Sequence, residues 1–186
     1  MIKKVIRISC VLFLIFLLGS GCAKEDDAWM YAPPQEELDA MWEALVEFGE
    51  EYRDTLNEMS EFFADAVDKE VFYQATDEEE RRKSFPSIEE LAEGFTDEES
   101  KMVLENLSPY YCKYSNDVFI EIRYVYGQCG EWGKNNPYYY WFAYLDTDGE
   151  QLEEYLEFKR HGRDFWNRIY KLNEHLYAVE ETCMAT

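Results

Sequence analysis

The amino-acid sequence predicts an α+β protein in which N-terminal helices pack on a C-terminal antiparallel sheet of four or five strands. Apolar residues recur at steps of three and four up to about residue 107, and at steps of two after residue 110. These are the periods of a helix and of a strand. Composition divides at the same place, because residues 22–107 hold 27 acidic residues whereas residues 108–186 hold 19 aromatic ones. Helices followed by strands are typical of the α+β class.

The strongest helical pattern runs from residue 35 to about residue 70. Its apolar stripe consists of Leu38, Met41, Trp42, Leu45, Phe48, Tyr52, Leu56, Met59, Phe63 and Val67. We expect this stripe to cover a sheet; a groove for a partner helix, or a coiled coil, is the alternative. Gly49 interrupts the stripe and marks a bend, a break or a close packing contact. A straight helix of this length would span about 50 Å, so the sequence favours a bend or a break.

Residues 76–107 predict short helices with recognisable starts. Ser87 with Glu90, and Thr96 with Glu99, have the spacing of a capping box. Acidic residues at helix starts complement the helix dipole. The acidic clusters of this segment therefore indicate helix starts, and no metal site is predicted there.

Alternating patterns after residue 110 predict strands over 118–126, 138–145, 152–159, 165–172 and 176–180. Segment 138–145 is apolar on both faces, which is typical of a central or doubly covered strand. We interpret residues 146–149 as a hairpin turn. The alternative is a calcium loop with Gly149 at its sixth position, but such a loop would place Tyr144 and Tyr155 where acidic ligands are required. The order of elements is similar to that of cystatin-like and NTF2-like rolls, although no motif of either family is present.

The first 22 residues have the order of an export signal. Lys3, Lys4 and Arg7 precede an apolar run over 11–18, small residues follow, and the chain then becomes acidic. The apolar run is shorter than the roughly 20 residues of a spanning helix. An uncleaved N-terminal anchor and a secreted protein that is cleaved elsewhere are the alternatives.

The segment from Leu18 to Cys22 resembles the lipobox of bacterial lipoproteins, with Gly19 three positions before the Cys. The resemblance implies a signal peptide over 1–21 and a lipid on Cys22. An acidic tether over 22–35 would follow, and then a single domain over 36–186, helical over 36–107 and a sheet over 108–186. It also implies a protein anchored at the cell membrane and facing the extracellular space or the periplasm.

Net charge restricts the partners. The full chain carries −22, and removal of the three basic residues of the signal leaves −25. Nucleic acid is not an expected partner, because phosphates are bound by clustered Lys and Arg. A basic protein or peptide is electrostatically favoured. The simpler interpretation is that the acidic surface keeps an exported protein soluble.

No catalytic motif is present, and the sequence predicts no cofactor and no bound metal. His161 and His175 fall at predicted turns and are expected to be solvated. Cys112, Cys129 and Cys183 remain after the signal and the lipidated Cys are removed, and we expect three buried thiols; a disulfide between two of them is the alternative.

Aromatic residues of the sheet are the best functional lead. Trp132, Tyr139, Trp141 and Trp166 form a candidate binding surface, because Tyr and Trp are enriched at interfaces. The alternative is that helices cover both faces and bury them. The sequence therefore favours a non-enzymatic binding module for a protein or an envelope component. An anchored immunity or inhibitor protein against a basic extracellular toxin, and a small-pocket enzyme of NTF2-like shape, are the alternatives.

Overall fold

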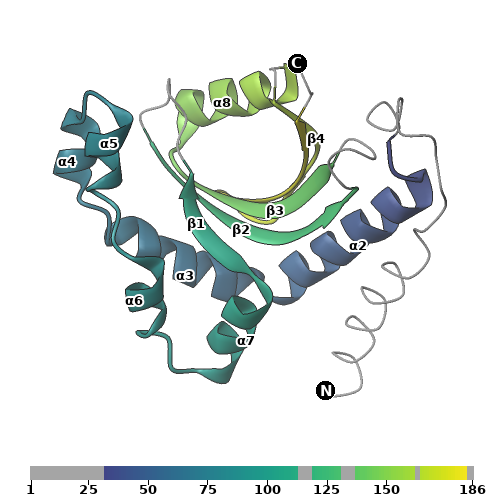
Figure 1. Ribbon diagram of the computed structural model, residues 1–186, viewed down its shortest axis with the longest axis horizontal. Coiled ribbons are helices and arrows are strands. Elements are labelled where there is room, and N and C mark those ends of the chain that lie inside the picture. Colours follow the sequence, from purple (N-terminus) through teal and green to yellow (C-terminus); the bar gives the residue numbers. More distant parts are fainter. Residues whose placement is uncertain (1–31, 113–118, 131–136, 162–163, 184–186) are drawn as a thin grey trace, which may run out of the picture.

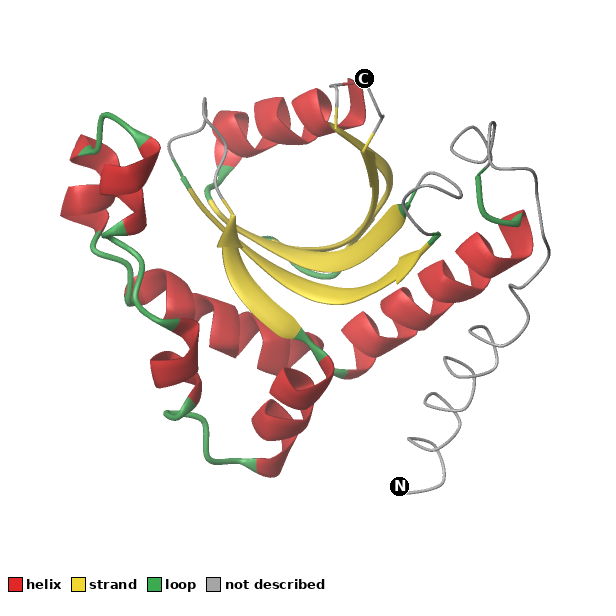
Figure 2. Cartoon of the chain, viewed as in Figure 1, coloured by secondary structure: helices red, strands yellow, loops and turns green. Residues whose placement is uncertain are grey.

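The computed structural model describes residues 32–112, 119–130, 137–161 and 164–183. It confirms the α+β class, because a series of helices precedes an antiparallel sheet (Figure 1, Figure 2). The leading helices are α2 (Gln35–Glu51), α3 (Arg53–Asp65), α4 (Lys69–Gln74), α5 (Glu78–Arg82), α6 (Ile88–Ala92) and α7 (Glu98–Asn106). The strands are β1 (Ser108–Cys112), β2 (Ile120–Cys129), β3 (Tyr138–Asp146), β4 (Asp164–Lys171) and β5 (Leu176–Cys183).

The sheet has five strands in the order β1-β2-β3-β5-β4, and all neighbouring pairs are antiparallel. Figure 1 shows that the sheet curls strongly. Helices α2 and α3 lie against its outer, convex side, and helix α8 (Gly149–His161) lies on the inside of the curl. The face toward α2 and α3 is called the outer face below, and the face toward α8 is called the inner face. Since both faces of the sheet are covered, β2, β3 and β5 bury side chains that point to the outer face as well as side chains that point to the inner face.

The long helical segment is broken, as the sequence favoured. Helix α2 ends at Glu51, and Tyr52 leaves the helical conformation with φ −115° and ψ 21° before α3 begins. Gly49 has a separate role in close packing. A Cβ atom at this position would lie 2.7 Å from Phe142 Cε1 and 2.8 Å from Leu172 Cδ1. The absent side chain therefore lets α2 approach β3 and the end of β4.

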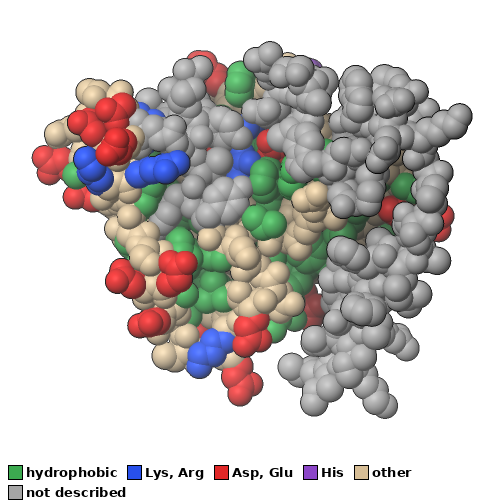
Figure 3. Space-filling model, in the orientation of Figure 1, with side chains coloured by type: hydrophobic (Ala, Val, Ile, Leu, Met, Phe, Trp, Pro, Cys, Tyr) green, Lys and Arg blue, Asp and Glu red, His purple; other side chains and the backbone are tan. Residues whose placement is uncertain are grey.

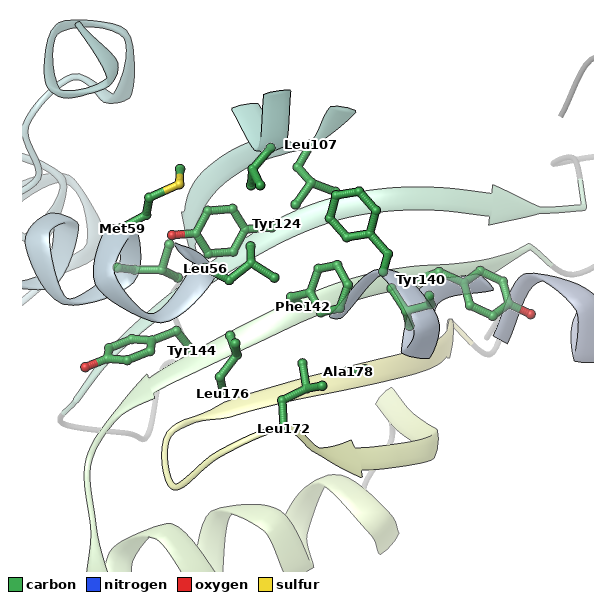
Figure 4. Close-up of a cluster of buried hydrophobic side chains, with 14 of the residues drawn as sticks. Leu56, Met59, Leu107, Tyr124, Tyr140, Phe142, Tyr144, Leu172, Leu176 and Ala178 are labelled. Carbon is green, nitrogen blue, oxygen red and sulfur yellow. The ribbon is translucent and has the colours of Figure 1, made fainter. Parts of the chain in front are cut away.

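The larger core lies between the outer face and helices α2, α3 and α7 (Figure 4). The apolar stripe predicted over 35–70 supplies the helical side of this core, and it covers a sheet as expected. One polar pair is buried in it: Ser60 and Tyr124 share a hydrogen bond of 2.8 Å between their hydroxyls. Burial of these hydroxyls is tolerated because each has a partner.

The short helices have side-chain caps. Ser87 accepts from the Glu90 N–H at the start of α6, as its capping box predicts. Carboxylates cap three further short helices: Asp68 for α4, Asp77 for α5 and Asp97 for α7. Asp97 lies one residue after the predicted start at Thr96. A carboxylate is as good a cap as a hydroxyl, so a Thr-Asp pair leaves the first helical residue ambiguous by one.

The prediction of a hairpin turn at 146–149 and a strand at 152–159 is wrong. Residues Gly149–His161 form α8, which buries Leu152, Tyr155, Leu156 and Lys159 and exposes 55% of Phe158. The buried positions follow steps of three and four. The strand interpretation had paired Leu152 and Leu156 with Phe158, which is on the opposite side of the helix.

The fifth strand is instead β1, which the sequence did not predict. It pairs with β2 along Ser108–Cys112. The other strand predictions are confirmed: β2 and β3 match 118–126 and 138–145, β3 is central, and β4 and β5 form the C-terminal hairpin. Within the described part of the chain, no helix has the length and apolar character needed to cross a membrane.

Candidate functional site

The inner face of the sheet carries charged and aromatic side chains in register across four strands. Gln128 of β2 lies opposite Tyr139 of β3. Tyr139 lies opposite Glu181 of β5, and Glu181 lies opposite Trp166 of β4. Directly opposite residues of an antiparallel pair project from the same face. The pairing therefore places these four residues in one row across the inner face.

Arg123 of β2 is the centre of a buried ion-pair network. Its Nε donates to Glu121 Oε1 at 2.6 Å, and its Nη1 donates to Glu181 Oε2 at 3.0 Å. The three residues are 1–3% exposed. Charge-assisted hydrogen bonds of this kind are the strong ones. The network joins β2 to β5, which β3 separates, and the Arg123 guanidinium lies over the Trp141 ring of β3.

Each carboxylate of the network has a second partner. The Tyr155 hydroxyl, from α8, donates to Glu121 Oε2 at 2.7 Å. The Trp166 indole N–H donates to Glu181 Oε2 at 3.1 Å. Lys159 of α8 is buried beside them, with its Nζ 5.6 Å from the centroid of the Tyr155 ring. Helix α8 is therefore fixed to the sheet by polar contacts as well as by Leu152 and Leu156.

The aromatic part of the inner face is a stack along β3. The rings of Tyr139 and Trp141 have centroids 5.9 Å apart and planes 18° apart. Arg123 Cζ lies 4.2 Å from the centroid of the Trp141 ring. By register, Arg123 and Tyr139 belong to the rows on either side of Trp141. Tyr139 and Trp141 are half-buried, so this stack borders the buried network and still meets solvent.

Chemically, the inner face offers flat aromatic surface next to hydrogen-bonding groups held in fixed positions. Its four buried charges, Glu121, Glu181, Arg123 and Lys159, sum to zero. Among the residues described, no three or more His, Cys, Asp or Glu side chains are grouped so that they could hold a metal ion. The arrangement suits recognition of a ligand by stacking and hydrogen bonding.

The predicted binding residues differ in how far they are buried, and one of them lies outside the described part of the chain. Tyr139 and Trp141 lie side by side on the inner face and are half-buried. Trp166 shares that face but is 2% exposed, so it supports the network beneath the surface. Cys22 and Trp132 lie outside the described residues.

Sequence reasoning did not identify the charged half of this site. Glu121 and Arg123 are two residues apart in an otherwise apolar strand, and this spacing puts both on one face. Two charged residues at this spacing indicate a buried ion pair only if that face of the sheet is known to be covered by another element. The misread helix α8 is the element that covers it.

A second polar cluster lies on the outer face, where α2 begins. Glu180 Oε2 accepts from the Tyr140 hydroxyl at 3.0 Å and lies 3.6 Å from Arg168 Nε. Arg168 also donates to Asp39 Oδ1 of α2 at 2.6 Å. Burial raises the pKa of Glu180 above its usual value, whereas the hydrogen bond from Arg168 lowers the pKa of Asp39. This cluster ties the start of α2 to the sheet.

Cys129 lies next to this cluster and is a buried free thiol. Burial raises its pKa to about 11, so the thiol stays protonated at neutral pH and is a poor nucleophile. Since this thiol is free, it forms no disulfide with Cys112 or Cys183. The two His residues are not part of either cluster: His161 is exposed, and His175 packs against Leu145 and Thr147 carbonyls.

The outer surface of the helical layer is acidic. Figure 3 shows Asp and Glu side chains over the helices at the left and bottom of the view, where α4 to α7 lie. Helices α2 and α3 together hold 11 acidic residues and a single basic one, Arg53. Arg53 is already paired with Glu50 and Asp54.

Comparison with known proteins adds no assignment. No family model matches the chain, and searches of curated proteins and of solved structures also found no match.

Proposed function

We propose that this protein is a lipid-anchored extracytoplasmic binding protein whose ligand site is the inner face of the sheet. The anchor is the lipid on Cys22, and residues 22–35 tether the domain to the membrane. The observation that carries the proposal for the site is the half-buried Tyr139–Trp141 stack, which borders a buried charge network. Stacked aromatic rings beside fixed polar groups are characteristic of ligand sites.

The charge network supports this choice of face. A buried ion pair is weak support for stability, because removal of its charges from water costs about as much as their attraction returns. Apolar residues at Glu121, Arg123 and Glu181 would cover the sheet at least as well. We therefore interpret the network as an arrangement that holds the half-buried Trp141 ring in a fixed position on the inner face.

Retention on envelope material tests the site. Full-length protein purified in detergent is mixed with envelope material from which lipid has been extracted, so that retention does not depend on the anchor. We expect the protein to sediment with this material, and Trp141→Ala to reduce the bound fraction at least about fivefold, since loss of one aromatic contact is worth about 1 kcal/mol. Tyr73→Ala is the control, because Tyr73 is 48% exposed on α4. Equal retention of both variants would contradict the proposal.

The anchor is tested separately by mass spectrometry of the mature N-terminus. We expect a chain that begins at a lipid-modified Cys22. An N-terminus at an unmodified Ala23, or at Met1, would contradict it.

The acidic surface of α2 and α3 favours a second candidate, an anchored inhibitor or immunity protein for a basic partner. Nine of their 11 acidic residues are exposed, and such a surface accelerates association with a cationic protein in a salt-dependent way. A pull-down at low and at high salt distinguishes this candidate. Capture of a basic protein that is lost at high salt and is unaffected by Trp141→Ala would favour it over the inner-face site.

A further inference from the structure

We propose that Glu180 is a pH-dependent switch that controls how firmly the first turns of α2 are held to the sheet. When its carboxyl group is neutral, Tyr140 and Arg168 bind α2; when it is ionised, it competes with α2 for both of them. The switch lies on the outer face of the sheet, opposite the face of the proposed ligand site, and it does not depend on that site. Two arrangements carry the inference, one at Tyr140 and one at Arg168.

The Tyr140 hydroxyl has one hydrogen and two acceptors within reach. Its oxygen lies 3.0 Å from Glu180 Oε2 and 3.3 Å from the Leu38 carbonyl oxygen of α2. A tyrosine hydroxyl donates a single hydrogen bond and can also accept one. An ionised Glu180 can only accept, so it draws this hydrogen away from α2. A neutral Glu180 can donate its own hydrogen to the Tyr140 oxygen, and the Tyr140 hydrogen is then directed to Leu38.

Arg168 is shared between Glu180 and α2 in a similar way. Its Nη2 donates to Asp39 Oδ1 of α2 at 2.6 Å, and its Nε lies 3.6 Å from Glu180 Oε2. The Arg168 guanidinium also lies 5.8 Å from the centroid of the Trp42 ring of α2. An ionised Glu180 attracts the guanidinium toward the sheet. When that charge is removed by a proton, the attraction of Asp39 prevails and the guanidinium stays with α2.

Among the described residues of this cluster, Glu180 is the group whose charge changes between pH 8 and pH 4.5. The titratable and charged groups that face it are Cys129 of β2, Tyr138 and Tyr140 of β3, Arg168 of β4 and Asp39 of α2. Burial raises the pKa of the thiol and of both tyrosines, and the hydrogen bond from Arg168 lowers the pKa of Asp39. These groups therefore keep their charge in this range, and a guanidinium is always protonated.

Burial of Glu180 sets the direction of the switch. The residue is 2% exposed, and burial raises its pKa despite the opposing contacts of Tyr140, Arg168 and Asn167. The closed protein therefore binds the proton more tightly than a protein in which α2 has opened and Glu180 meets water. For each unit by which the pKa is raised, opening is about tenfold less favourable with the proton bound than without it. The start of α2 is held firmly in acid and loosens as the pH rises through the raised pKa.

Hydrogen–deuterium exchange of the full-length protein in detergent, followed by mass spectrometry, tests the switch. Exchange is measured between pH 8 and pH 4.5, the usual pKa of a Glu carboxyl, and is corrected for the intrinsic dependence of exchange on pH. We expect protection of the amides of residues 38–44 to rise at least about threefold as the pH falls. Protection of α7 should change less, because α7 contributes none of the residues named above.

Three variants assign the effect to the cluster. Glu180→Gln is neutral at every pH and should keep the high protection of residues 38–44 throughout. Glu43→Gln, at an exposed acid of α2, is the control and should keep the pH dependence of the wild type. Tyr140→Phe removes the contact with Leu38 and should lower protection at pH 4.5 at least about twofold.

Equal protection of residues 38–44 at both ends of the pH range would overturn the inference, and so would a pH dependence that persists in Glu180→Gln. Circular dichroism establishes that each variant is folded. If Glu180→Gln does not fold, Tyr140→Phe decides the matter, since unchanged protection at pH 4.5 in that variant would also overturn the inference.

Discussion

At the scale of single residues, Arg123 is closely constrained by its surroundings. It is 2% exposed, donates to two carboxylates and packs on the Trp141 ring. Loss of one partner from a buried network leaves an uncompensated charge, which costs far more than the network contributes when complete. The two carboxylates that depend on Arg123 therefore make it the most sensitive polar position of the inner face.

We expect Arg123→Ala to lower the free energy of unfolding by about 3–5 kcal/mol, because the buried Glu121 and Glu181 would both lose the guanidinium that donates to them. Arg53→Ala is the matched control. Arg53 also contacts two acidic side chains, Glu50 and Asp54, but its side chain is 43% exposed, so its loss should cost less than about 1 kcal/mol. Urea unfolding followed by circular dichroism measures both. Similar values for the two variants would show that the inner network is not buried as described.

Glu180 makes stability depend on pH. Burial raises its pKa in the folded protein, so the folded state holds the proton more tightly than the unfolded chain does. The folded protein therefore gains stability as the pH falls through the raised pKa, and it loses this stability as the pH rises through it. At neutral pH the buried carboxylate has a cost of about 1.4 kcal/mol for every unit by which its pKa is raised.

Glu180→Gln removes this cost and keeps an acceptor for the Tyr140 hydroxyl. We expect the variant to be more stable than the wild type at pH 7, with the difference closing as the pH falls toward 4.5, the usual pKa of a Glu carboxyl. Arg168 keeps Asp39 as its partner in the variant. The exposed Glu43→Gln substitution is the control and should leave the curve unchanged. A Glu180→Gln protein that is less stable than the wild type at pH 7 would show that the Arg168 ion pair outweighs burial.

At the scale of elements, helix α8 shows that the spacing of apolar residues does not always distinguish a helix from a strand. Leu152 and Leu156 fit a strand together with Phe158, and they fit a helix together with Tyr155 and Lys159. Helix-forming composition, Glu150 in the first turn and three basic residues in the last turn all support the helix. The Asp-Thr-Asp-Gly sequence favoured the hairpin interpretation, because Asp-Gly is the strongest short hairpin signal. Here Gly149, with φ 56°, begins the helix instead.

Gly49 determines how closely α2 approaches the sheet. We expect Gly49→Ala to destabilise the protein by about 1–3 kcal/mol through overpacking against Phe142 and Leu172, although Ala favours helix by about 1 kcal/mol. Gly127→Ala is the control, because the nearest atom to its added Cβ would be the flexible Met41 Sδ at 3.4 Å. Thermal unfolding compares the two. A Gly49→Ala protein more stable than the wild type would mean that α2 can move away from β3 at no cost.

At the scale of the whole molecule, the class of fold was predictable because helices and sheet differ both in period and in composition. The outer core was predictable too, since one continuous apolar stripe supplies its helical side. The inner site was predictable only in part. Tyr139 and Trp141 stand out as aromatic excess on β3, but Glu121, Arg123 and Glu181 meet only through pairing of distant strands and the cover that α8 provides.

This organisation also separates two surfaces. The helical layer presents acidic residues to solvent on the outer side, while the inner side of the sheet holds aromatic rings and balanced charges. The start of α2, which follows the proposed membrane tether, is held to the sheet by Asp39 and Arg168. On this organisation, we propose that the ligand binds on the inner side of the sheet.

Photo-crosslinking in living cells tests this location of the ligand. A p-benzoylphenylalanine is introduced at Tyr139 in one full-length protein and at Tyr73, on the helical layer, in another, and intact cells are irradiated. We predict a covalent adduct with an envelope component from position 139 and none from position 73. Adducts from position 73 alone, or none from position 139, would contradict a ligand site on the inner face of the sheet.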